Sequence, residues 1–177
     1  MPGKNPAEAV EEYLIPIRRS MSCFSKAVVR SDGYDPDVIH TVTFREPTVE
    51  LITNSEEILA LSFVQSFELD KALFGWKVCT RSYWYEIDDD QGREILAFHW
   101  HPNGSSSEDK PHLHISDGAA RNLRSEIRDM HFPTPRISFE EFALMLIEDF
   151  GVIPDKEDSI PTLNENLARF NGKKTWG

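Results

Sequence analysis

The chain has 177 residues, of which 40% are hydrophobic and 28% charged, and its formal net charge is -11 at pH 7. These values are typical of one soluble globular domain, placed here at residues 1–177, and exclude a second domain of ordinary size. No apolar run reaches the roughly 18 residues of a transmembrane helix, so no membrane span is expected. The acidic N-terminal segment lacks the apolar stretch of a secretory signal. Together with two widely separated cysteines, this predicts a reducing, bacterial-type cytoplasmic location.

The acidic excess is distributed unevenly along the chain. Residues 77–136 carry eight basic and ten acidic residues, residues 1–76 seven and twelve, and residues 137–177 four and eight. Because affinity for nucleic acid depends mainly on neutralising phosphates, the whole surface is not expected to grip nucleic acid. A local basic pocket remains compatible with this charge, as does an acidic surface that binds a basic protein partner.

The predicted elements begin with a helix over residues 6–29, because an apolar stripe from Ala7 to Ile17 recurs at three- and four-residue spacing. Pro16 predicts a kink or split in that helix. Six strands are then predicted within residues 40–116 from alternation and from β-branched and aromatic content. Their approximate ranges are 40–44, 48–53, 58–69, 76–87, 93–101 and 112–116.

The last third of the chain, residues 118–170, is predicted to be helical. The predicted helices span 118–130, 138–150 and 161–170, and Ser138 is placed as the N-cap of the second one. Strands grouped before helices indicate an α+β fold. We expect an antiparallel sheet of about five to six strands, packed on one face by the N-terminal helix and the C-terminal helices.

Four of the six histidines fall within sixteen residues, as two His-X-His pairs. Side chains alternate across a strand, so the large apolar residues of 93–101 and 112–116 are expected to face the core and the histidines the opposite side. If the two strands pair, the four imidazoles form one cluster. Its members are His99, His101, His112 and His114. The other two histidines, His40 and His131, are interpreted as structural.

The strand 76–87 and the strand 93–101 read as a hairpin around the turn 88–92. A five-residue loop would place Arg81 opposite His99, and Cys79, Arg81, Tyr83 and Tyr85 on the histidine face. A loop one residue shorter or longer would reverse the faces of the first strand.

Three interpretations of the histidine face are open. The imidazoles could bind a divalent metal such as Zn, Mn, Fe or Ni. Alternatively, with no metal, His99 or His101 could act as base and His112 or His114 as acid, with Arg81 clamping a phosphate and Tyr83 positioning it, as in cleavage of RNA. In the third interpretation the histidines are a polar surface without a function.

The segment from the 77–87 strand through Asp-Gln-Gly, Ala97–His101 and Pro111–His114 to the helix 138–150 resembles the TumE-like family of bacterial toxin–antitoxin proteins. This chain departs from that family in its histidine spacing and its longer N-terminal part. The resemblance implies a toxin acting on RNA or another growth-essential target and neutralised by a cognate antitoxin. The histidines it carries over are His99, His112 and His114, with His101 less directly matched.

The leading expectation is therefore a cytoplasmic toxin-like ribonuclease that uses the histidine cluster. A metal-binding protein or metal-dependent hydrolase built on the same four histidines is the alternative. A non-catalytic interaction module, supported by the acidic surface, is a third.

Overall fold

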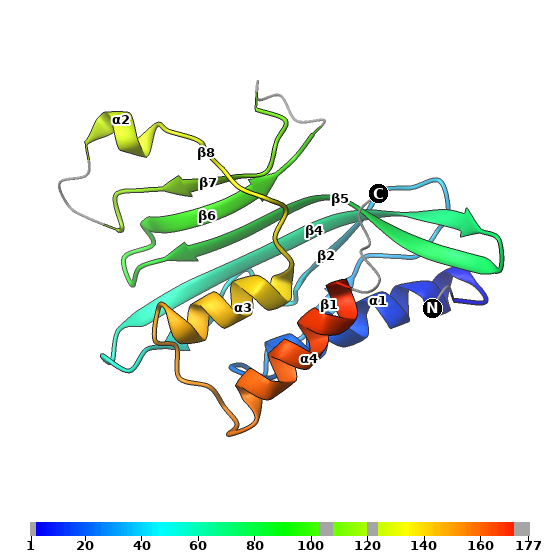
Figure 1. Cartoon of the computed structure of the whole chain (residues 1–177), viewed down its shortest axis with the longest axis horizontal. Coiled ribbons are helices and arrows are strands. Elements are labelled where there is room, and N and C mark those ends of the chain that lie inside the picture. The colour runs from blue at the N-terminus through cyan, green and yellow to red at the C-terminus, as the bar shows by residue number, and fades with distance from the viewer. Residues whose placement is uncertain (1–2, 103–107, 120–123, 172–177) are drawn as a thin grey trace.

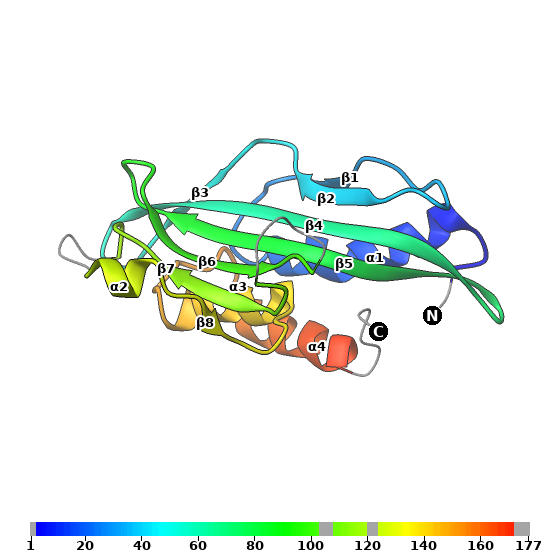
Figure 2. The ribbon, with the colours of Figure 1, turned by 90° about the horizontal axis from the view of Figure 1, so that it is seen from above.

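The computed structural model describes residues 3–102, 108–119 and 124–171. An antiparallel sheet of eight strands has α1, α3 and α4 on one side, while α2 lies beside β7 (Figures 1 and 2). The helices are α1 (Pro6–Met21), α2 (Ser125–Arg128), α3 (Phe139–Glu148) and α4 (Ser159–Asn171). The strands are β1 (Val29–Ser31), β2 (His40–Phe44), β3 (Val49–Ile52), β4 (Ile58–Ala72), β5 (Gly75–Asp88), β6 (Glu94–Trp100), β7 (His112–Ile115) and β8 (Phe132–Pro133). Within the described ranges, no helix is long and apolar enough to cross a membrane.

The strand order is β1-β2-β4-β5-β6-β7-β8, and β3 pairs with the part of β4 that β2 leaves free. The long strands β4 and β5 form the central hairpin, and β6, β7 and β8 are added in turn to the β5 side. The predicted α+β class is confirmed. The sheet has more strands than expected because β1 and β8 have three and two residues, too few for alternation to be visible in the sequence.

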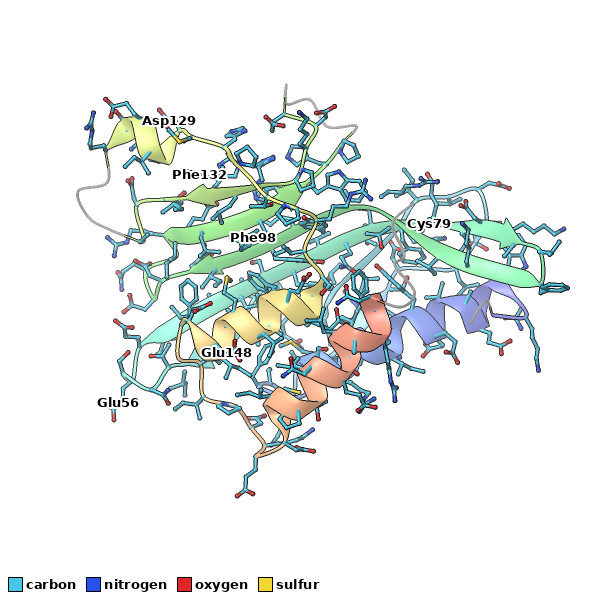
Figure 3. All side chains as sticks on the ribbon, viewed as in Figure 1. Glu56, Cys79, Phe98, Asp129, Phe132 and Glu148 are labelled. Atoms are coloured by element: carbon cyan, nitrogen blue, oxygen red, sulfur yellow. The ribbon has the colours of Figure 1, made fainter. Side chains whose placement is uncertain are left out.

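The core lies between the sheet and the helices. The helix-facing residues of β4 and β5 alternate with exposed ones, as a sheet covered on one face requires. On that face, Tyr85 lies 5.3 Å and Phe98 6.0 Å from Phe142 of α3, measured between ring centroids. Figure 3 marks Phe98 on β6. These contacts join two neighbouring strands, β5 and β6, to α3 through aromatic rings.

The first helix is shorter than predicted but is not broken by Pro16. Asn5 caps it by accepting a hydrogen bond from the amide of Glu8, and Pro6 occupies the first turn, where a missing amide costs little. The helix ends at Met21, and the chain then enters β1, in which Val29 pairs with Phe44. The predicted range 6–29 was therefore wrong in its last turns, because the apolar stripe stops before β1.

The predicted helix 118–130 is also wrong over most of its described part. Gly118 lies in a turn, where its amide donates to the carbonyl of Glu94. Among the described residues of this range, only α2 is helical. Residues 120–123 lie outside the described residues. By contrast, the predicted helix at 138–150 is confirmed as α3, where Ser138 and Glu141 form a reciprocal capping box.

Both cysteines are free thiols. Cys23, after α1, is 1% exposed and Cys79 is 8% exposed. Cys79 lies in the half of β5 that extends beyond its pairing with β6 (Figure 3). Burial raises the pKa of both thiols.

Glu140 of α3 is 3% exposed. Burial raises the pKa of its carboxyl, and the neighbouring charge of Glu141 acts in the same direction. A carboxyl whose pKa is raised in the folded state destabilises the fold once the pH rises through that pKa. At low pH the carboxyl is protonated in both the folded and the unfolded state, and this cost is absent. We therefore expect Glu140→Gln to raise the free energy of unfolding at pH 8, with an advantage that shrinks towards pH 4. Urea denaturation across this pH range measures it.

The matched control for this prediction is Glu148→Gln, at the exposed end of the same helix. It makes the same chemical change at the surface and should change the free energy of unfolding at pH 8 by no more than about 0.5 kcal/mol. An equal effect of the two substitutions at pH 8 would contradict a cost from burying Glu140.

Candidate metal centre

The histidine strands pair as predicted. In the ladder between β6 and β7, His99 lies opposite His112 and Ala97 lies opposite His114. Leu96 and Phe98 face the helices, so the histidines lie on the side of the sheet away from the helices, with His101 one residue beyond β6. The four predicted histidines therefore gather on one face.

The predicted register of the preceding hairpin is wrong. Asp88 pairs with Glu94, but Ile87 pairs with Leu96, so Ile95 is an extra, bulged residue on β6. One extra residue exchanges the faces of a strand. As a result Trp84, rather than Arg81, lies opposite His99, and their ring centroids are 3.9 Å apart.

The bulge moves two predicted residues, Tyr83 and Tyr85, from the histidine face to the core side of the sheet. Tyr83 is 2% exposed on the core side, where its hydroxyl accepts a hydrogen bond from the amide of Ile137 at 3.2 Å. Burial raises the pKa of Tyr83 to about 12. Arg81 stands at a second irregularity in the pairing of β4 with β5 and forms ion pairs with Glu68 at 2.8 Å and Asp70 at 3.9 Å. The predicted positioning tyrosine is thus not on the histidine face, while the predicted phosphate clamp, Arg81, is exposed and paired with two acidic side chains.

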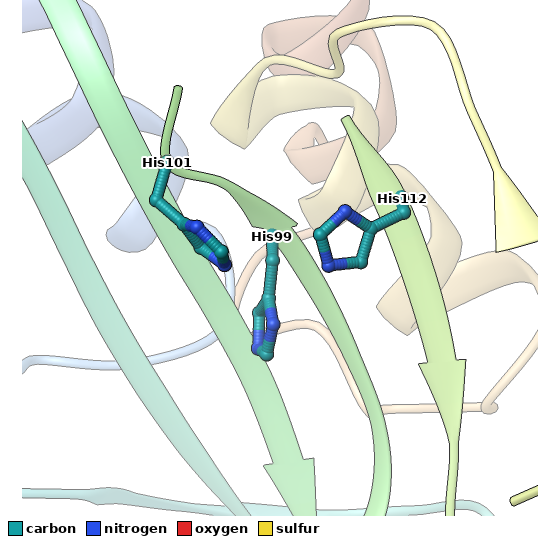
Figure 4. A group of neighbouring side chains, drawn as sticks. All are labelled: His99, His101 and His112. Atoms are coloured by element: carbon teal, nitrogen blue, oxygen red, sulfur yellow. The ribbon is translucent and has the colours of Figure 1, made fainter. Parts of the chain in front are cut away.

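Three histidines form what we call the inner triad: His99, His101 and His112. Figure 4 shows their rings converging from the end of β6 and the start of β7. The ring centroids are 5.9 Å apart for His99 and His101, 5.6 Å for His99 and His112, and 5.5 Å for His101 and His112. One nitrogen of each ring lies within 4.8 Å of one nitrogen of both others. The three rings are therefore nearly equidistant and share a common centre.

Each ring of the inner triad also has a buried nitrogen with no hydrogen-bond partner among the residues that the structure describes. These atoms are Nε2 of His99, Nδ1 of His101 and Nε2 of His112. A buried polar group without a partner costs about 1–3 kcal/mol, so such groups are rare unless a ligand or water satisfies them. One common ligand that accepts their lone pairs would satisfy all three nitrogens.

His112 is held by a hydrogen bond that identifies which of its ring nitrogens is the donor. Its Nδ1 lies 2.7 Å from the carbonyl oxygen of Lys110. Because a carbonyl only accepts, Nδ1 is the donor in this bond, and Nε2 is the nitrogen left to bind a ligand. Histidines that bind metals are usually oriented in this way by a second hydrogen bond.

His99 is 6% exposed. Burial lowers the pKa of its imidazole to about 3, and the neighbouring His114, His112 and His101 act in the same direction. The ring is therefore neutral near pH 7, which is the form that coordinates metals.

A second set, which we call the outer triad, shares one member with the inner triad. It consists of His112, His114 and His131, each again with one nitrogen within 4.8 Å of the others. The ring of His131 stacks on His112 at 4.7 Å and lies 4.4 Å from His114. Burial lowers the pKa of His114, and its histidine neighbours add to this.

His131 is the residue of the cluster that the sequence did not indicate. It was interpreted as a structural histidine at the end of a helix, but the chain there forms β8, whose pairing with β7 brings His131 beside His112 and His114. A two-residue strand that includes a proline carries no readable periodicity. The remaining histidine, His40, is not part of the cluster, since it bonds Asp32 at 3.1 Å and the carbonyl of Asp35 at 2.9 Å.

The spacing of the inner triad suits a transition metal. Zinc binds imidazole nitrogens at about 2.0–2.1 Å, so tetrahedral ligand nitrogens lie roughly 3.3–3.4 Å apart. In the inner triad the three nitrogens lie within 4.8 Å of one another, and small ring rotations would bring them to the separation that zinc requires. Sets made only of imidazoles suit Zn, Ni, Cu or Fe rather than Mg or Ca, which prefer oxygen ligands.

No known protein family matches this chain, and neither curated proteins nor solved structures show significant similarity to it. The function is therefore argued from the site itself.

Proposed function

We propose that this protein binds one divalent transition-metal ion, such as Zn²⁺, through His99, His101 and His112. The observation that carries the proposal is that these three rings each bring one nitrogen within 4.8 Å of the others and each have a buried nitrogen without a hydrogen-bond partner among the described residues. A metal would satisfy all three at once, whereas separate waters would each need two or more polar partners. The bond from His112 to the carbonyl of Lys110 supports it by fixing the donor atom.

The proposed site has three protein ligands, which leaves one tetrahedral position for water or substrate. Three-ligand sites are typical of catalytic metals, whereas structural zinc usually has four protein ligands. A bound metal would supply Lewis acidity and a water of lowered pKa. The protein would then act as a metal-dependent hydrolase, whose substrate reaches the ion from the side of the sheet that carries Trp84, which is 43% exposed.

The direct test is elemental analysis of the purified protein, followed by titration of the metal-free form with Zn²⁺ and Co²⁺. We expect about one ion per chain, and a Co²⁺ spectrum with the strong visible bands of a tetrahedral site. A protein that purifies without metal and binds neither ion would refute the proposal.

Metal binding should also stabilise the fold. A ligand that binds only the native state adds about 2.7 kcal/mol when its free concentration is 100 times its Kd. We therefore expect Zn²⁺ to raise the thermal midpoint of the metal-free protein and a chelator to lower that of the loaded protein. Mg²⁺ is the control ion and should have no effect, because it prefers oxygen ligands. Calorimetry or thermal circular dichroism measures both.

A second candidate function follows from the side chain next to His99. Trp84 is 43% exposed, and its ring lies 3.9 Å from that of His99, so it offers a stacking platform for a nucleobase beside an imidazole. We propose, as the alternative, a toxin-like ribonuclease in which the histidines act as acid and base and a cognate antitoxin blocks this face. The arginine clamp expected from the sequence is not part of it.

RNA cleavage in excess chelator separates the two candidates. If the protein is a ribonuclease of this kind, RNA cleavage survives chelation. The cleavage rate falls at least tenfold in His99→Ala and also falls in Trp84→Ala. His40→Ala, a histidine outside the cluster, is the control. RNA left intact by the wild-type protein under these conditions would exclude the alternative.

A further inference from the structure

The two triads share His112, and this has a consequence for how an ion would reach the inner triad. His112 is 2% exposed and its Nδ1 donates to the carbonyl of Lys110, so it has one lone pair, at Nε2, to give. An ion bound by the inner triad and an ion bound by the outer triad would compete for that lone pair. The five histidines therefore offer two positions but hold one ion at a time.

The two positions differ in their exposure to solvent. In the inner triad His99 and His112 are buried, whereas in the outer triad His131 is exposed and His114 is half-buried. A hydrated ion loses its waters stepwise, so it is captured most readily where a histidine is exposed. The exposed end of the cluster is thus the outer triad.

The two positions also differ in the number of unpartnered buried nitrogens that a bound ion would satisfy. His99, His101 and His112 each have a buried nitrogen without a partner among the described residues, whereas the outer triad contributes such an atom only through His112. Coordination at the inner triad therefore removes three unfavourable buried groups and coordination at the outer triad removes one. At equilibrium the inner triad is favoured.

We propose that the outer triad is a loading site: it captures the ion from solution, and His112 then carries it to the inner triad. In the transfer the bond to His112 is kept, the bonds to His114 and His131 break, and bonds to His99 and His101 form. The number of metal–nitrogen bonds and the protonation of the rings are unchanged. This inference rests on the proposed metal-binding function and adds to it a route of entry.

The geometry supports such a transfer. The ring centroid of His112 lies 4.7 Å from that of His131 and 5.5 Å from that of His101, so an ion held by His112 needs only a short displacement to exchange its other ligands. His131 stands next to the two-residue β8, whereas the inner ligands are anchored on or beside the longer β6–β7 ladder. The capturing ligand is also the one exposed ring of the five.

The test is stopped-flow mixing of the metal-free protein with Co²⁺, followed by its visible absorption. We expect two phases: a capture step whose rate rises with Co²⁺ concentration, and a transfer step whose rate does not. His131→Ala should slow loading at least tenfold while keeping the final stoichiometry and changing the Kd less than threefold. Met130→Ala, at the exposed neighbouring position, is the matched control and should load like the wild type.

The outcomes separate this inference from the proposed function. If Co²⁺ binds with one ion per chain but His131→Ala loads as fast as the wild type, the loading site is wrong and the metal site stands. If two ions bind per chain, the exclusive use of His112 is wrong. If no Co²⁺ binds at equilibrium, the metal site itself is wrong and the loading site fails with it.

Discussion

Replacing His112 by alanine is expected to abolish metal binding, with a loss in affinity of at least about 100-fold. This exceeds the roughly 10–100-fold cost of losing an outer partner of a metal ligand, because a ligand itself is removed. His112 belongs to both triads, so neither can compensate. Isothermal titration with Zn²⁺ and elemental analysis of the purified variant measure the effect.

The matched control is His114→Ala, two residues along the same strand and outside the inner triad. It should keep about one ion per chain, because His99, His101 and His112 remain. Circular dichroism of the metal-free variants shows whether each still folds. A folded His112→Ala protein that retains its metal would contradict the assignment of this residue as the central ligand.

The largest effect on stability is expected from Phe142→Ala. Phe142 is 0% exposed, and its ring contacts Tyr85 and Phe98, so it joins α3 to two neighbouring strands. Truncating a buried phenylalanine to alanine costs about 3–5 kcal/mol through lost burial and the cavity left behind. Chemical denaturation at pH 7 should therefore show a lower midpoint with an unchanged slope.

Phe74→Ala makes the same chemical change at a residue that is 82% exposed. It should change the free energy of unfolding by no more than about 0.5 kcal/mol, as is usual for surface substitutions. A loss below about 1 kcal/mol for Phe142→Ala would mean that the packing of α3 on the sheet differs from that described.

The sequence predicted those parts of the fold in which a periodic pattern is long enough to read. The six longer strands alternate, and Ser138 with Glu141 marks the start of α3, so the class and most of the elements follow from local chemistry. The sequence did not predict the strands β1 and β8 or the end of α1. Segments of two or three residues are fixed by their pairing partners rather than by their own composition.

The same limit applied to the site. His99, His101, His112 and His114 were found because alternation places them opposite apolar neighbours on two paired strands. Tyr83 was placed on the wrong face because of one bulged residue, Ile95, which has no recognisable signature in the sequence. His131 was missed because its place depends on a long-range pairing.

The buried thiols provide an internal probe of how this molecule opens. A thiol reacts with alkylating reagents as the thiolate, so Cys23 and Cys79 should be labelled mainly during transient exposure. Cys23 donates to the carbonyl of Ser159 and reports on separation of α1 from α4, while Cys79 reports on the outer half of the β4–β5 hairpin. Neither belongs to a triad, so alkylation rates with and without bound ion would show which half of the protein becomes more rigid.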